Sequence, residues 1–267
     1  NFAETSLETP LGSGPYRVTE MEPGRHIVYQ RIDDYWAESL PSRVGYHNVG
    51  SIRYDVYRDS TVALEAFKAH AYDYREEYIA RNWANAYDFD AVRQGKVTLD
   101  ETAHRIPRGM QAFLFNLRRD KFADRHVREA IALTFDFEWM NKTLFYDAYE
   151  RNDSFFQNTP FAADGPPSPA ELALLRPFAD VIPAAALTSD YTPPKSDGSG
   201  FIRERLIRAD KLLRQAGWII KDGARVHRET GEPLALEVLA RQDSLGRVVL
   251  AMERNLKTLG IPVRFRS

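Results

Sequence analysis

The stretch Phe115-Asn-Leu-Arg-Arg-Asp-Lys-Phe-Ala-Asp-Arg-His-Val-Arg-Glu-Ala-Ile-Ala-Leu-Thr-Phe-Asp136 decides the fold of this chain. Its first residue ends an apolar segment, residues 113–115, that is expected to be a strand. A charged turn follows. A helix is expected to start after Asp124, because apolar residues then recur at helical spacing. Its buried face is expected to hold Val127, Ala130, Ile131 and Thr134. The stretch therefore predicts a connection between two packed units.

The composition is that of a globular protein with room for one large domain or two ordinary ones. The chain has 267 residues, 43% of them hydrophobic, which is enough for a substantial core. Its formal net charge is -2 and its 36 Lys and Arg are scattered, so we expect no nucleic-acid partner. No run approaches the roughly 18 apolar residues of a membrane span. The first residues lack the pattern of a signal peptide, so we expect a mature or trimmed chain.

Residues for catalysis or metal binding are sparse. The chain has no Cys, which excludes disulfides, Cys-bound metals and thiol catalysis. Its 6 His lie far apart in the sequence, so no metal site and no cofactor is expected. The adjacent acids Asp33-Asp34 and Glu76-Glu77 do not suit a hydrolase, because neighbours in a strand point to opposite faces. We expect a protein without catalytic activity and keep a peptide or glycan hydrolase as a less favoured alternative.

The part of the chain before the opening stretch is predicted to mix strands and helices. Alternating apolar residues predict a hairpin and three further strands, at residues 14–32, 51–57, 96–100 and 110–116. One helix capped by Ser60 and one or two short helices over residues 82–92 are expected between them. This order predicts a mixed sheet in an α/β arrangement.

The predicted secondary structure changes after the opening stretch. Helices are expected to about Tyr149, and a long irregular excursion with a short helix over residues 170–175 follows. Its prolines are Pro160, Pro166, Pro167, Pro169, Pro177, Pro183, Pro193 and Pro194. A loop of this length is usually functional or packed as a cover. An apolar stripe then predicts a helix over residues 202–216, and residues 234–265 have the pattern of a βαβ unit.

Several motifs, in this order, resemble the family 5 bacterial extracellular solute-binding proteins, the dipeptide and oligopeptide receptors of ABC importers. They are Gly12-Ser-Gly-Pro-Tyr-Arg-Val18, Tyr35-Trp36, Ala209-Asp-Lys-Leu-Leu-Arg-Gln-Ala-Gly-Trp218 and Leu259-Gly-Ile-Pro-Val263. The opening stretch resembles the family's hinge region, in which Asn116, Phe122, Asp124, Val127, Arg128, Ala130 and Asp136 fill the family's places. The runs at residues 135–146, 167–175 and 197–200 are similar to the Yej-type subgroup, which serves an importer of peptides and peptide-like antibiotics such as microcin C.

The resemblance implies an α/β fold of the type II periplasmic-binding-protein, oligopeptide-receptor-like kind, with two lobes and mixed sheets. Residues 1–118 would be part of lobe I and residues 119–267 part of lobe II, closing about a hinge at Asn116, Leu117 and Asp124. The chain would be a fragment of a monomeric periplasmic receptor nearly twice as long. That receptor would capture peptides or peptide conjugates between its lobes and deliver them to the membrane permease of the importer.

The resemblance also implies a ligand contact near the end of a lobe II strand. In oligopeptide receptors of this family an Asp after such a strand pairs with the α-ammonium group of the peptide. Asp243 falls near that place, next to Arg241 and Gln242. Asp243 also precedes a predicted helix, so N-capping of that helix is an alternative role.

An aromatic cluster lies between the predicted hinge helix and the proline-rich excursion, where a cleft between lobes would be found. We expect its members Trp139, Tyr146, Tyr149 and Phe155 to form the flat wall of a peptide pocket. Ordinary core packing is the alternative for these side chains. A non-catalytic interaction or chaperone-like module that uses the same aromatic residues is a further alternative function.

Overall fold

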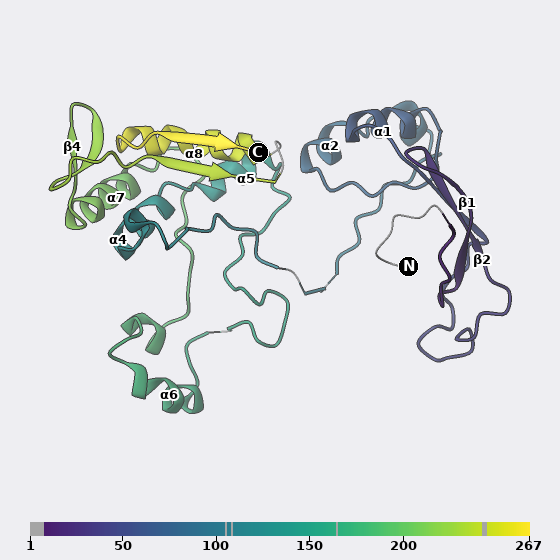
Figure 1. The fold of residues 1–267 in the computed structure, drawn as a ribbon, viewed down its shortest axis with the longest axis horizontal. Coiled ribbons are helices and arrows are strands. Elements are labelled where there is room, and N and C mark those ends of the chain that lie inside the picture. Colours follow the sequence, from purple (N-terminus) through teal and green to yellow (C-terminus); the bar gives the residue numbers. More distant parts are fainter. Residues whose placement is uncertain (1–7, 105, 108, 164, 242–244) are drawn as a thin grey trace. The chain divides into compact units, whose positions relative to one another are not determined.

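A computed structural model of the chain describes residues 8–104, 106–107, 109–163, 165–241 and 245–267. It divides into two compact units, Asn1–Glu76 and Glu77–Ser267, whose elements are drawn in Figure 1. Residues 77–118 thus group with the second unit, although the sequence suggested a division at residues 118 and 119. At the end of this segment Phe115 packs against the core of unit 2, where its ring lies 5.3 Å from that of Phe122. Compact units and receptor lobes are different divisions, so the two lobes stay a prediction.

Unit 1 is built on an antiparallel sheet of three strands in the order β1, β2, β3. The strands are β1 (Tyr16–Glu22), β2 (His26–Arg31) and β3 (Ser51–Asp55). They confirm the predicted hairpin and third strand. Helix α1 (Ser60–Lys68) buries Leu64 and Phe67. Its N-cap is Asp59 rather than the expected Ser60, because the Asp59 carboxylate accepts from the backbone of Thr61 and Val62 at 3.0 Å each.

Unit 2 begins with two short helices, α2 (Ala80–Asn85) and α3 (Asp90–Arg93), as expected. The strands predicted at residues 96–100 and 110–116 are absent from the described part of the chain. A strand needs a neighbouring backbone to complete its ladder, and the described residues supply none to these two segments. Alternation alone was therefore a misleading signal in both places.

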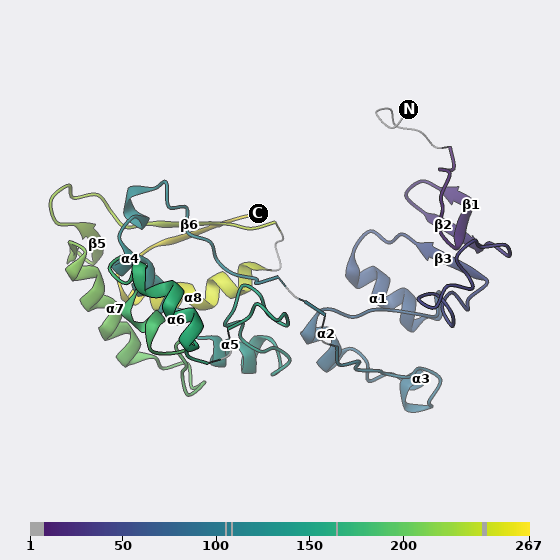
Figure 2. The same ribbon diagram turned by 90° about the horizontal axis from the view of Figure 1, so that it is seen from below.

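The body of unit 2 combines four helices with two pairs of strands. Its elements are η1 (Asp120–Phe122), α4 (Arg125–Ala132), α5 (Phe137–Leu144), α7 (Arg203–Gln215), β4 (Trp218–Lys221), β5 (Ala224–His227), β6 (Leu236–Leu239), α8 (Gly246–Thr258) and β7 (Val263–Arg266). Strands β4 and β5 pair antiparallel, whereas β6 and β7 pair in parallel. Helix α8 connects β6 to β7 and runs alongside them in both views (Figures 1 and 2), which confirms the predicted βαβ unit.

The core of unit 2 lies where α4, α7 and α8 meet these strands. Its buried members are Val127, Ala130, Ile131, Leu133, Met140, Ala209, Leu213, Trp218, Leu234, Leu236, Val248, Met252, Leu256, Leu259 and Ile261. All four residues predicted for the inner face of this helix are buried: Val127, Ala130 and Ile131 on α4, and Thr134 just after its end, where its hydroxyl donates to the carbonyl oxygen of Ile131 at 2.7 Å. Periodicity thus identified the helix face that carries the core.

One ion pair is buried at the edge of this core. The Arg225 side chain is 1% exposed and donates from Nη2 to Asp210 Oδ1 at 2.7 Å. It also donates from Nε to the carbonyl oxygen of Leu259 at 2.9 Å. Burial by itself would raise the pKa of Asp210, but hydrogen bonds from Arg225 and Arg214 hold that pKa below its usual value. The pair ties β5 to α7 and to the end of α8.

The proline-rich excursion, defined here as residues 152–163 and 165–192, is inserted between α5 and α7. It contains α6 (Pro169–Leu175) and the short 3-10 helices η2 (Arg176–Phe178) and η3 (Ala184–Leu187). Helix α6 confirms the expected short helix and begins with a capping box between Ser168 and Glu171. None of the described residues in these two ranges is buried, whereas Pro193, which the sequence had placed in the excursion, is buried just after them.

Candidate ligand-binding site

The predicted hinge segment is held by local and tertiary hydrogen bonds. The Asn116 side chain accepts from the backbone N–H of Arg118 at 3.2 Å, and Asp124 caps α4 by accepting from the backbone N–H of His126 at 2.7 Å. Between them, the Lys121 ammonium group donates to the carbonyl oxygen of Ala235 at 2.6 Å. Leu117 is 61% exposed. The segment is anchored to the body of unit 2, and its role as a hinge stays a prediction.

The turn that follows α5 presents the predicted tyrosines. Tyr146 and Asp147 are consecutive residues with positive φ values of 55° and 57°, a conformation that is costly for residues other than glycine. Asn141 holds this turn from α5. Its amide donates to the carbonyl oxygen of Tyr149 at 2.8 Å and accepts from the Tyr149 N–H at 3.2 Å. The turn is therefore fixed by a side chain of the preceding helix.

Both tyrosines of this turn face solvent in part. Tyr146 is 44% exposed and Tyr149 is 43% exposed. The Tyr149 ring lies 4.9 Å from the Phe145 ring, and the Arg247 guanidinium lies 5.9 Å from the Phe145 centroid. The turn thus presents two partly exposed tyrosines, of which Tyr149 is supported by the Phe145 ring, and both can stack on apolar or planar ligand groups.

The other predicted aromatic residues lie apart from this turn. Trp139 is partly buried against the core, and the Arg254 guanidinium lies 5.7 Å from its ring centroid. A Cβ atom added to Gly200 would stand only 2.8 Å from the Trp139 ring, so the chain passes directly over that ring. Phe155 belongs to the excursion and is 73% exposed. Trp139 therefore occupies the packed position that was the alternative for this cluster.

The predicted polar ligand residues follow β6. Arg241 is exposed just after this strand. Gln242 and Asp243 lie outside the described residues, so the choice between an ammonium partner and an N-cap for Asp243 stays open. The sequence-based proposals for these residues stay predictions.

A polar network that sequence reasoning missed lies at the start of α5. Asp136 is 3% exposed and its Oδ1 accepts from Ser196 Oγ at 2.5 Å. Arg205 donates from Nη2 to the carbonyl oxygen of Phe135 at 2.6 Å. Burial lowers the pKa of Arg205, and Arg151 adds to that effect, whereas Asp136 and Glu138 oppose it. The residues come from segments 60 or more positions apart in sequence, so only the fold brings them together.

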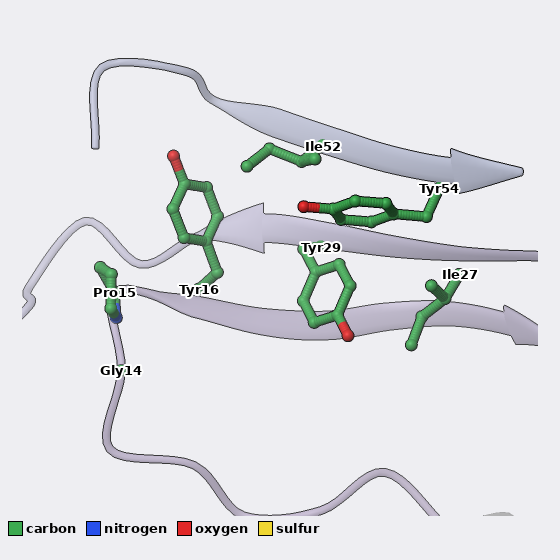
Figure 3. Close-up of a pocket in the computed structure, with 7 residues that line it drawn as sticks. All are labelled: Gly14, Pro15, Tyr16, Ile27, Tyr29, Ile52 and Tyr54. Atoms are coloured by element: carbon green, nitrogen blue, oxygen red, sulfur yellow. The ribbon is translucent and has the colours of Figure 1, made fainter. Parts of the chain in front are cut away.

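A second surface that sequence reasoning missed lies on the sheet of unit 1. Figure 3 shows aromatic and aliphatic side chains from all three strands around an open depression of about 440 Å³. Its lining consists of Gly14, Pro15, Tyr16, Ile27, Tyr29, Ile52 and Tyr54. The Tyr29 and Tyr54 rings meet edge to face at 5.8 Å, and the Tyr16 hydroxyl donates to the carbonyl oxygen of Val49 at 2.6 Å. Alternation of apolar residues along the strands was the available signal for this face.

Two further kinds of feature are absent from the described part of the chain. No group of three or more His, Cys, Asp and Glu side chains is placed to hold a metal ion there. Among the same residues, no helix is both long and apolar enough to cross a bilayer.

Comparison with known proteins then identifies the family. Residues 1–267 match the model of "Bacterial extracellular solute-binding proteins, family 5 Middle". The chain belongs to this family. The chain is also 47% identical to the uncharacterized protein YejA of Escherichia coli K12, over 97% of its own length and 43% of that protein. It therefore spans less than half of that relative's length.

Two further relatives of this family 5 chain come from Agrobacterium fabrum. One is named a probable peptide-binding protein YejA, with 35% identity over 100% of this chain and 44% of the relative. The other is named a peptidoglycan-binding protein YepA, with 36% identity over the same shares. A solved periplasmic oligopeptide-binding protein of an ABC transporter from Thermotoga maritima matches with a TM-score of 0.63 and 17% identity, over 99% of this chain and 44% of that one. This likeness shows the type II periplasmic-binding-protein fold of the oligopeptide-receptor kind.

Proposed function

We propose that this chain is part of a periplasmic receptor that captures peptides or peptide-like compounds and delivers them to the membrane permease of an ABC importer. Membership of the family 5 solute-binding proteins supports this role. The observation that carries it is the turn after α5, where Asn141 holds Tyr149 by two hydrogen bonds and Tyr146 has a strained, positive φ, with both tyrosines partly exposed. Strain of this kind persists where the surrounding structure fixes it, often at ligand sites.

In this proposal the receptor binds its ligand without altering it. The ligand stabilises a closed arrangement of two lobes by its higher affinity for that arrangement, and the permease recognises the closed form. The hinge would lie at Asn116, Leu117 and Asp124. Backbone hydrogen bonds to an extended peptide would supply much of the affinity, with aromatic side chains such as Tyr146 and Tyr149 forming pocket walls.

The test uses the full-length receptor, titrated by calorimetry with short peptides and with peptidoglycan-derived muropeptides. We expect Tyr146→Ala and Tyr149→Ala each to weaken the better ligand class about tenfold, the usual effect of removing a central aromatic contact. Phe178→Ala is the matched control, because Phe178 is 57% exposed but lies on the excursion. Unchanged affinity in both tyrosine variants would remove this turn from the site.

The same preparation tests the absence of catalysis. Ligands recovered after long incubation should have their original mass. Cleavage that disappears on replacement of one residue would instead support the hydrolase alternative.

Asp243 is proposed as the partner of the ligand's α-ammonium group. Asn caps a helix as well as Asp does but carries no charge. We therefore expect Asp243→Asn to weaken peptides with free N-termini more than N-acetylated peptides, while the melting temperature stays the same. Equal affinity of the wild-type receptor for both peptide types would leave Asp243 as a cap.

A further inference from the structure

The two ends of the proline-rich excursion are joined to each other. Arg151, just before the excursion, donates from Nη1 to the carbonyl oxygen of Pro194, just after it, at 2.6 Å. The Arg151 guanidinium also lies 5.6 Å from the centroid of the Phe135 ring. Burial lowers the pKa of Arg151, although Glu138 opposes that effect. A partly buried cation thus closes the loop at its base.

The returning end is fastened by Ser196. Its backbone N–H donates to Glu138 Oε2 at 3.0 Å, and its hydroxyl donates to Asp136 Oδ1 at 2.5 Å. The same hydroxyl accepts from the backbone N–H of Gly198 at 3.1 Å. Asp136 and Glu138 both belong to the start of α5. Ser196 therefore attaches the end of the excursion to the body through hydrogen bonds.

Between these fastenings, the excursion has no core of its own. None of its described residues is buried; several of its large apolar side chains are exposed, whereas Leu172, Leu175 and Ile182 are only partly covered. The most exposed of them are Phe155, Phe161, Leu174 and Val181, at 73%, 79%, 74% and 78%. One hydrogen bond in this span runs from the Asn158 amide to the carbonyl oxygen of Ile106 at 3.3 Å. Burial of apolar surface, the main source of folding free energy, contributes little here.

We propose that the excursion is a strap that opens as one unit while α4, α7 and α8 stay folded. The free energy of local opening depends on the apolar surface and the hydrogen bonds that are lost. For this strap the loss is concentrated in the contacts of Arg151 and Ser196. The two contacts lie at opposite ends of the strap, so weakening either one should promote the same opening.

Hydrogen exchange of the full-length protein, followed by mass spectrometry, tests this coupling. The variants are Ser196→Ala and Arg151→Met, the latter keeping an apolar stem but no donor. Ser189→Ala is the matched control, because the Ser189 hydroxyl donates within the excursion to the carbonyl oxygen of Ala185 at 3.0 Å. The reporters are the amides of Leu172 and Val181, which lie within the strap and donate to the carbonyl oxygens of Ser168 and Phe178 rather than to either mutated residue.

We expect both end variants to accelerate exchange of these reporters about fivefold, the effect of losing one ordinary hydrogen bond. Amides of α7 and α8 should change less than about twofold, the scatter expected of substitutions outside a shared cooperative unit. The Ser189→Ala variant should match the wild type at all of these sites. Two results would overturn the proposal. One is an exchange rate of the reporter amides that is unchanged in Arg151→Met. The other is an increase in the exchange rates of α7 and α8 as large as that of the reporters.

Discussion

The body of unit 2 and the excursion inserted into it are stabilised in different ways. In the body, periodic apolar residues of α4, α7 and α8 are buried against short strands. In the excursion no described residue is buried, and the contacts that fasten it are hydrogen bonds at its ends. The comparison teaches that regular helices and a capping box are not evidence of a core. A segment can have local structure and still depend on a few polar contacts.

The largest expected effect concerns the buried ion pair of the body. Arg225→Ala should destabilise unit 2 by about 3 to 5 kcal/mol, because it opens a cavity at a fully buried side chain and removes one partner of Asp210, which keeps only its ion pair with Arg214. It also removes the donor to the carbonyl oxygen of Leu259. Denaturant unfolding followed by helical circular dichroism measures this loss. A loss below about 1 kcal/mol would mean that water replaces the guanidinium group easily.

A pair of leucines compares the two regions directly. Leu213 of α7 is fully buried, so Leu213→Ala should cost about 2 to 5 kcal/mol of unfolding free energy. Leu174 of α6 is 74% exposed, so Leu174→Ala should change the same quantity by less than about 0.5 kcal/mol. Unfolding curves of both variants provide the measurement. Similar losses in the two would show that α6 packs against something in the intact protein.

The sequence predicted the body better than the site, for physical reasons. The face of α4 and the βαβ unit follow from apolar periodicity, which is local information. The strands expected at residues 96–100 and 110–116 failed because pairing depends on a distant partner. The network of Asp136, Ser196 and Arg205 could not be predicted, because its members are joined only by tertiary folding. The ligand-binding role proposed for Tyr146 and Tyr149 stays a prediction, and the fixation of Tyr149 by Asn141 could not be read from the sequence.

Acid should weaken the body through Asp210. Its pKa is lower in the folded state than in the unfolded chain, so its contribution to stability is complete above the unfolded value of about 4. That contribution is lost as the pH falls through the folded value. Unfolding free energies measured between pH 6 and pH 3 should therefore fall less steeply in Asp210→Asn than in the wild type. Parallel curves for the two proteins would assign the acid sensitivity to other carboxylates.

The smallest expected effect separates two helix caps. Asp124 caps α4 of the body, and Ser168 caps α6 of the excursion, where Glu171 completes a capping box. Asp124→Ala should cost about 1 kcal/mol of global unfolding free energy, because α4 is part of the cooperative core. Ser168→Ala removes a comparable bond but should leave global unfolding unchanged and increase hydrogen exchange only within the excursion. If Ser168→Ala instead lowers the global unfolding free energy as much as Asp124→Ala, the excursion unfolds together with the body, and the distinction between the two regions fails. If neither variant changes global unfolding, the stability of the core does not depend on the cap of α4, and the difference between the regions rests on side-chain burial alone.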